Sequence, residues 1–283
     1  MQDGSRSAHG WRHLIASPLC AIAVLAAFAT AISAAELRPE TIAAFNRYVA
    51  LTEQRMDHEP FLIVDALPEP TRHATFTDLH NGGLRIEPLD TRDAGRRIEV
   101  PGGLIHHWIG DVFLPGVSVQ DVAALLQGYD HHAEIYAPVV TRSKLLERVD
   151  DSFRFYLRFT MKKVITVVVN SEHNAKFSMP GPGRVEGRIH SLRIAEVDHP
   201  NTPEEREKPV GNDGGYLWRL NTYWRLQARD GGTYVQCESV SLTRNIPTGF
   251  GWLVRPFVTN IPRESLTFTL RTTQERLIAA IRP

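Results

Sequence analysis

The stretch Trp218-Arg-Leu-Asn-Thr-Tyr-Trp-Arg-Leu226 decides the fold, because large apolar and polar side chains alternate along it. Alternation with a period of two is typical of a β-strand that buries one face. The turn residues Asp230-Gly-Gly232 follow, and a second strand-like run extends from Thr233 to Arg244. Together they predict an antiparallel hairpin whose apolar side faces the interior.

The same pattern continues on both sides of this hairpin. Upstream, turn residues separate four more strand-like runs, over residues 139–148, 153–161, 164–177 and 185–197. Before them, residues 104–114 predict a strand, Ser118 caps a short helix, and residues 129–138 form a second helical turn. Downstream, apolar residues share one stripe of a long helix that begins with Pro262 in its first turn: Leu266, Leu270, Leu277 and Ile281.

This order of elements predicts an α+β fold. A curved antiparallel sheet of about six or seven strands wraps around the C-terminal helix, and curvature leaves space between them. We expect this space to be lined by large apolar residues: Trp218, Leu220, Trp224, Phe155, Leu157 and Leu270. Three polar residues are expected beside them: Arg219, Tyr223 and Glu238. Such a lining suits an apolar small molecule, and the alternative is a solid core.

Two segments carry a resemblance to a known family. They are Trp108-Ile-Gly-Asp-Val-Phe-Leu-Pro-Gly-Val117 and Leu125-Leu-Gln-Gly-Tyr-Asp-His-His-Ala-Glu-Ile-Tyr-Ala-Pro-Val-Val140. With the element order, they resemble the START-like or SRPBCC superfamily of helix-grip domains over residues 104–283. The later segments 215–225 and 238–247 resemble uncharacterised exported bacterial members. The resemblance implies a fold and an apolar ligand, but it does not select a function, because this fold hosts many.

The N-terminus has the order of a secretory signal peptide. Arg6 and Arg12 precede an uncharged stretch that ends in small residues, Ser33-Ala-Ala35. We expect cleavage after Ala35, with Ala31 as the alternative site, and therefore an exported, periplasmic or secreted protein. A retained membrane anchor is the other interpretation of this stretch. The predicted organisation is thus a signal peptide (1–35), an N-terminal extension (36–103) and a helix-grip domain (104–283).

The N-terminal extension begins with an amphipathic helix over residues 39–58, followed by an irregular part in which 61–64 reads as a short strand. This extension can cap or block the expected cavity. At the other end of the domain, residues 245–257 are rich in glycine and aromatic residues. There, Phe250 and Trp252 are candidates for a gate or a membrane-touching tip, and the alternative is a packed loop.

Several functional classes find no support in the sequence. Basic and acidic residues balance at 32 each, so no electrostatic footprint for nucleic acid is present. Asp130-His-His132 and Glu134 lack the ligand spacing of a zinc site, and we expect no metal and no cofactor. Cys237 is expected in the core, and no nucleophile elbow occurs. Acid–base catalysis would fall to Glu238, Arg219 and Tyr223, with Glu238 and Arg219 paired across adjacent strands.

Three functional hypotheses remain open at this point. The first is an extracytoplasmic carrier that binds a lipid-like or polyaromatic molecule without turnover, with transient membrane contact as a further expectation. The second is an enzyme of the aromatase/cyclase type acting on such a molecule. The third is a structural domain with a filled core. The sequence does not identify the ligand or the oligomeric state.

Overall fold

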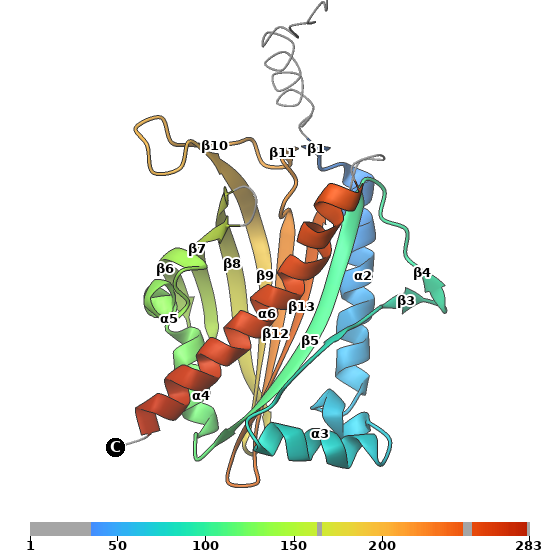
Figure 1. The fold of residues 1–283 in the computed structure, drawn as a ribbon, viewed down its shortest axis with the longest axis vertical. Helices are drawn as coiled ribbons and strands as arrows, with labels where there is room; N and C mark the ends of the chain where they lie inside the picture. Colours follow the sequence, from blue (N-terminus) through green and yellow to red (C-terminus); the bar gives the residue numbers. More distant parts are fainter. Residues whose placement is uncertain (1–34, 163–165, 246–250, 282–283) are drawn as a thin grey trace, which may run out of the picture. The chain divides into compact units, whose positions relative to one another are not determined.

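The structure, a computed structural model, describes residues 35–162, 166–245 and 251–281. In these residues the main feature is a nine-stranded antiparallel sheet (Figure 1). Its strands follow the order β2 (Leu84–Pro88), β5 (Gly103–Pro115), β13 (Gly232–Arg244), β12 (Arg219–Arg229), β9 (Arg184–Asp198), β8 (Thr166–Gly181), β7 (Ser152–Lys162) and β6 (Val140–Val149), and β10 (Arg206–Glu207) pairs with β9. Two short ribbons lie outside it: β1 (Ala35–Glu36) with β11 (Asn212–Asp213), and β3 (Arg92–Asp93) with β4 (Arg96–Arg97).

Helices cover both faces of this sheet. They are α2 (Pro39–His58), α3 (Thr71–His80), α4 (Val119–Gln127), α5 (His132–Ile135) and α6 (Gly251–Ile281), with the 3-10 turns η1 (Ile63–Ala66) and η2 (Tyr129–His131). The long α6 crosses one face against β5, β2 and β13 (Figure 1). We call this the inner face, and the opposite face, on which α2 packs, the outer face. None of the helices in the described residues is long and apolar enough to span a bilayer.

The elements predicted from alternation and capping are confirmed. The six strands β6, β7, β8, β9, β12 and β13 lie within a few residues of their predicted ranges. Ser118 caps α4, since its hydroxyl accepts a hydrogen bond from the Asp121 backbone N–H at 3.1 Å. Asp230 and Gly231 both have positive φ, 58° and 74°, as the two-residue turn between β12 and β13 requires.

Two local predictions are wrong, and one helix was missed. Residues 61–64 are not a strand, and Ile63–Ala66 is a 3-10 turn. The α3 helix was not predicted, because only Leu79 of its ten residues is buried and its apolar pattern is weak. Finally, α6 begins at Gly251, so Pro262 lies inside the helix and not in its first turn.

Other predictions lie outside the described residues. The signal-peptide prediction falls on residues 1–34, and the gate residue Phe250 falls in 246–250. The side chain of Trp252 is likewise outside the described part. The segment 36–103 contributes β2 to the edge of the main sheet, where it pairs with β5 from Leu84–Val112 to Pro88–Trp108.

Candidate functional site on the inner face of the sheet

Strand alternation gives the two faces of the sheet opposite chemical character. Five residues in register form one row across the inner face: Gly187, Trp224, Cys237, Gly110 and Ile86. The neighbouring row on the outer face is polar: Glu186, Arg225, Gln236, Asp111 and Arg85. In the described strands, no inner position of β5, β7, β8, β12 or β13 carries a charged residue, and none of β9 does up to Ser191. The inner face is therefore uncharged over most of its area.

One half of the inner face is filled by apolar side chains. Leu266, Leu270 and Leu277 of α6 join a buried cluster with Trp224, Leu226 and Val235 of the hairpin. Leu270 is 0% exposed and lies over Gly110, where a Cβ atom would come within 2.5 Å of the leucine Cδ1. Because Gly110 has no side chain, α6 can lie directly on β5.

Between this cluster and the Arg244 end of β13, where Ser241 and Thr243 are buried again, the inner face is less well covered. Trp108, Leu220, Thr222 and Ser239 are only half-buried, although they occupy inner positions on interior strands of the sheet. Further along β12, Trp224 is 5% exposed. An inward side chain of a central strand is normally covered by the layer packed on it. The described residues therefore leave this part of the inner face accessible.

Aromatic and imidazole rings stack on the inner face over β7 and β8. Phe155 lies between Tyr129 and His173, with ring centroids 3.8 Å and 5.1 Å away and interplanar angles of 12° and 14°. His132 lies 5.0 Å from Tyr129, and the neighbouring Tyr136 shares a hydrogen bond of 3.0 Å with Thr273 of α6. The segment Tyr129–Tyr136 thus supplies a wall of rings between α6 and the far strands of the sheet.

Polar atoms in this stack lack partners. The hydroxyl of Tyr129, Nε2 of His132 and Nδ1 of His173 are enclosed and have no hydrogen bond. Burial lowers the pKa of His132 to about 4 and that of His173 to about 3, so both imidazoles are neutral near pH 7. Burial raises the pKa of Tyr129 far above its usual range. The stack is therefore an uncharged site with unused hydrogen-bonding capacity.

Most of the predicted apolar lining residues lie on the inner face. Phe155, Leu157, Trp224 and Leu270 belong to the inner apolar cluster, and Leu220 occupies the half-buried region of β12. Trp218 does not join them. It precedes β12, packs with Phe45 and Tyr48 of α2, and donates its indole N–H to Asp213 Oδ1 at 3.0 Å. The predicted alternation fails there because regular strand pairing starts at Arg219.

The predicted polar residues do not face the inner side. Tyr223 and Glu238 lie opposite one another in the hairpin and both point to the outer face, where α2 covers them. The Tyr223 hydroxyl donates to Glu53 Oε1 of α2 at 2.9 Å. Arg219 shares their outward parity and pairs in register with Leu242, so the predicted Glu238–Arg219 ion pair is not formed. Instead, its guanidinium donates to the Trp218 carbonyl at 2.8 Å.

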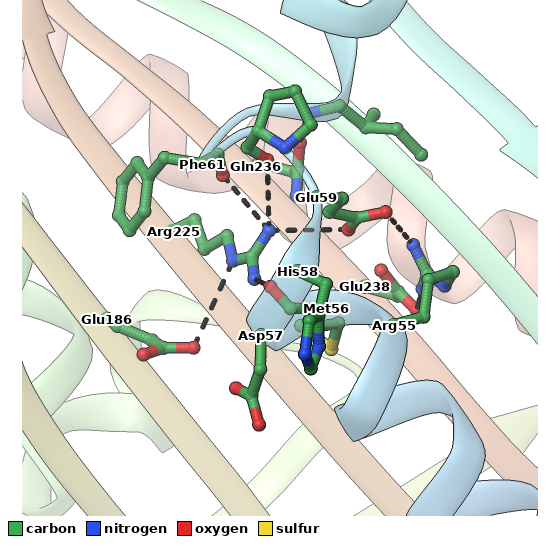
Figure 2. A network of polar contacts seen from close by, with 12 residues as sticks. Arg55, Met56, Asp57, His58, Glu59, Phe61, Glu186, Arg225, Gln236 and Glu238 are labelled. Carbon is green, nitrogen blue, oxygen red and sulfur yellow. Dashed lines mark hydrogen bonds and ion pairs between the residues drawn. The ribbon is translucent and has the colours of Figure 1, made fainter.

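The outer face holds a buried ionic network beneath α2 (Figure 2). Glu238, 0% exposed, accepts hydrogen bonds from Arg55 of α2 and from His107 Nε2, the latter at 2.6 Å. His107 Nδ1 in turn contacts the Tyr48 hydroxyl at 2.9 Å. Arg225 donates to backbone carbonyls at the end of α2, including that of Phe61 at 3.2 Å. These residues attach α2 to the sheet.

The sequence contained a signal for this arrangement. Arg225 and Glu238 occupy the polar positions of strands whose other face is apolar. Helix α2 carries Glu53 and Arg55, and Glu59 is its C-cap residue. Interior strands cannot leave charged side chains unpaired beneath a covering element. Complementary charges on the strands and on helix 39–58 would have predicted that this helix covers the outer face.

A separate surface pocket of about 350 Å³ lies on the outer side between α3 and the β12–β13 turn. Its lining residues are His73, Phe76, Thr77, His80, Arg229, Asp230 and Tyr234. The polar groups are already paired with one another, since Tyr234 donates to Asp230 at 2.8 Å and contacts His80 Nε2 at 2.5 Å. Arg229 is bound to Asp65 of η1. This pocket therefore offers few free hydrogen-bonding groups to a ligand.

The described residues contain no group of three or more metal-ligating side chains. The predicted candidates separate, because His132 turns into the aromatic stack while His131 and Glu134 form an exposed pair at 3.5 Å. Cys237 is buried, and burial raises the pKa of its thiol. It is thus a thiol, and not a thiolate nucleophile, near pH 7.

The order of elements in this domain is thus one strand, short helices, six further strands and a long helix that lies on the inner face. This is the helix-grip architecture that the sequence predicted. No family model and no curated protein matches this chain. Solved structures are similar to it. A STAR-related lipid transfer protein from Xanthomonas axonopodis shares 18% identity, covering 68% of this chain and 98% of its own, with a TM-score of 0.46.

Two further solved structures show the same range of similarity. An aromatase/cyclase from Streptomyces is 13% identical, covering 63% of this chain and 97% of its own, with a TM-score of 0.44. Human STARD10 is 12% identical, covering 73% of this chain and 80% of its own, with a TM-score of 0.37. At these identities the likeness concerns the fold alone, and the function has to be argued from the site.

Proposed function

We propose that this helix-grip domain binds a hydrophobic small molecule on its inner face and carries it without converting it. The observation that supports this proposal is the half-buried state of Trp108, Leu220, Thr222 and Ser239 at inner positions of interior strands. A solid core would bury these side chains. An apolar ligand lying between them and α6 would remove their remaining contact with water.

The uncharged character of the inner face supports an apolar ligand. A carboxylate or ammonium group brought there would lose its hydration and would find no opposite charge on the described strands. No inner position of the described strands β5, β7, β8, β12 or β13 is charged, and none of β9 is up to Ser191. The aromatase/cyclase alternative loses its predicted acid–base groups, because Tyr223 and Glu238 contact α2 on the other face. No observation on the inner face selects a reaction.

Filling the accessible part of the inner face tests the proposal. Nile red, a neutral dye that fluoresces in apolar surroundings, should bind the purified protein saturably. Thr222→Phe should weaken this binding at least about tenfold, which corresponds to about 1.4 kcal/mol, with an unchanged or higher Tm. Asn174→Phe is the matched control, since Asn174 is exposed at an outer position of β8, and it should bind like the wild type. Absence of saturable binding, or equal binding by Thr222→Phe, would contradict the proposal.

A further inference from the structure

The aromatic stack contains more information about the ligand than its apolarity. Three polar atoms without partners lie on rings along this stack: the Tyr129 hydroxyl, His132 Nε2 and His173 Nδ1. Their residues are only 1%, 8% and 2% exposed. An enclosed polar atom without a hydrogen bond destabilises a folded protein, so each such atom in a native structure needs an explanation.

The hydrogen bonds around His173 define what its free nitrogen can do. The Ser171 hydroxyl donates to the Leu157 carbonyl at 3.0 Å. Its oxygen therefore accepts from His173 Nε2, 2.9 Å away, and this nitrogen carries the proton of the neutral ring. Nδ1 is then a lone-pair acceptor. Because nothing donates to it, the complementary group is a hydrogen-bond donor.

His132 lies next to Tyr129, on the other side of Phe155. Its ring is neutral near pH 7 because burial lowers its pKa to about 4, and its Nε2 has no partner. A neutral imidazole carries its proton on either nitrogen, so Nε2 can accept a hydrogen bond from a donor. The Tyr129 hydroxyl beside it can donate or accept. One of the three free atoms thus requires a donor, and the other two can accept from one.

We infer that the ligand is an uncharged molecule whose polar end carries O–H or N–H donors, recognised by His132, His173 and Tyr129. The inference rests on the proposed binding function and specifies its ligand. A carboxylate has no proton to donate at neutral pH, so it cannot satisfy His173 Nδ1. An ether or ketone also only accepts and leaves His173 Nδ1 without a partner. An alcohol or phenol supplies the missing donor.

Entry of this polar end requires a local shift, because the three atoms are enclosed. Tyr129 and His132 belong to the short η2–α5 segment, outside the sheet. Rotation of their side chains leaves the strand pairing intact. Binding would then exchange unsatisfied polar atoms for hydrogen bonds, and this is the source of the expected preference.

Three matched probes test the inference: 2-naphthol, 2-methoxynaphthalene and 2-naphthoate. They share one ring system. The first can donate a hydrogen bond, the second can only accept one, and the third is an anion. Displacement of Nile red from the wild type should show 2-naphthol binding at least about tenfold more tightly than either of the others. Equal or tighter binding of 2-methoxynaphthalene or 2-naphthoate would overturn the inference. If Nile red itself does not bind, the proposed function fails instead, so the two failures are distinguishable.

Variants locate the effect. His173→Phe should reduce the preference for 2-naphthol at least about threefold while leaving the affinity for 2-methoxynaphthalene unchanged. Tyr129→Phe should weaken the binding of both probes, because it removes a hydroxyl that can donate to an ether as well as accept from a phenol. Tyr129→Phe should keep or raise the Tm of the free protein, because it removes an unsatisfied polar atom, whereas His173→Phe also loses the hydrogen bond from Nε2 to Ser171. His106→Phe is the control, since His106 Nε2 already contacts Thr243 at 3.0 Å, and its preference should stay that of the wild type. A preference for 2-naphthol that survives in His173→Phe would contradict the assignment.

Discussion

Glu238 shows how a single charged residue is accommodated inside this molecule. It lies on an interior strand, fully buried, and its carboxylate is bound by Arg55 of α2 and by His107 of β5. The Arg55 side chain is 31% exposed, so the pair lies at the boundary between the interior and water. The role of Glu238 is to attach α2 to the sheet, and not to act on a ligand at the inner face.

We predict that Glu238→Ala lowers the free energy of unfolding by about 3–5 kcal/mol, because His107 and Arg55 lose their acceptor while remaining covered. Urea unfolding of variant and wild type measures this difference. The control is Glu147→Ala, whose pair with Arg154 at 3.4 Å is exposed and should contribute less than about 1 kcal/mol. Equal losses in the two variants would mean that the ionic network beneath α2 is not formed.

The buried histidines predict how stability depends on pH. His173 has a pKa of about 3 in the folded protein, against about 6.5 in the unfolded chain. As pH falls below about 6.5, the unfolded chain binds a proton that the folded protein does not, so stability decreases by up to about 1.4 kcal/mol per pH unit. In His173→Phe this part of the slope should disappear. Urea unfolding between about pH 7 and about pH 4 tests it.

Asp111 provides a control of opposite sign. Burial raises its pKa to about 6, so the folded protein holds a proton that the unfolded chain has lost. Its contribution to stability is therefore present at low pH and is lost as pH rises through about 6. Acidification stabilises the fold through Asp111 and destabilises it through His173. Asp111→Asn should remove the first effect, and His173→Phe should remove the second. Slopes that change in the same direction in both variants would contradict these assignments.

At the scale of elements, the contact between α6 and β5 holds the long helix against the inner face of the sheet. Leu270→Ala should lower the free energy of unfolding by about 2–5 kcal/mol, because a fully buried side chain leaves a cavity. Gly110→Ala should also destabilise, since its Cβ would lie 2.5 Å from Leu270 Cδ1. Combined, the two changes should cost less than the sum of the single ones, because the shorter side chain makes room for the added methyl group. Strict additivity in urea unfolding would show that the two residues do not touch.

The elements also show how far sequence patterns reach. Strands with strict alternation and helices with a cap or an amphipathic stripe, such as β12, α4 and α2, were predictable because their signal is local. The α3 helix buries only one residue, so its stripe was too weak to identify. For α6, Pro262 was interpreted as a start signal, yet the helix extends through it from Gly251.

The candidate site was predictable only in part, because the sequence does not state what covers each face of a sheet. Phe155, Leu157 and Trp224 follow the alternation and lie on the inner face. Tyr223 and Glu238 follow it equally well, but onto the face that α2 covers. The stack of Tyr129, Phe155 and His173 joins η2 to two strands, and no local pattern announces such a tertiary contact.

At the scale of the whole molecule, export remains a proposal that rests on the N-terminal sequence. We predict that the protein recovered from outside the cytoplasm begins at Glu36 or within a few residues of it. Edman sequencing or mass spectrometry of the intact exported protein measures this. Finding Met1 on a soluble cytoplasmic form would contradict the proposal. The matched control is a variant with Ala31→Arg and Ala35→Arg, which should accumulate uncleaved.

Along the hairpin of β12 and β13, mostly apolar inward residues alternate with mostly polar outward residues. A shift of its register by one residue would therefore exchange the two sets of side chains between the faces. Inserting one residue into the middle of β12 would send Arg225 to the side of α6 and Trp224 into the ionic network beneath α2. Both layers would fail together, whereas an insertion at Asp230-Gly231 would only lengthen the turn. Tolerance to insertions should therefore change abruptly between strand and turn. Viable length variants of this domain are expected at the turn and not along the strands.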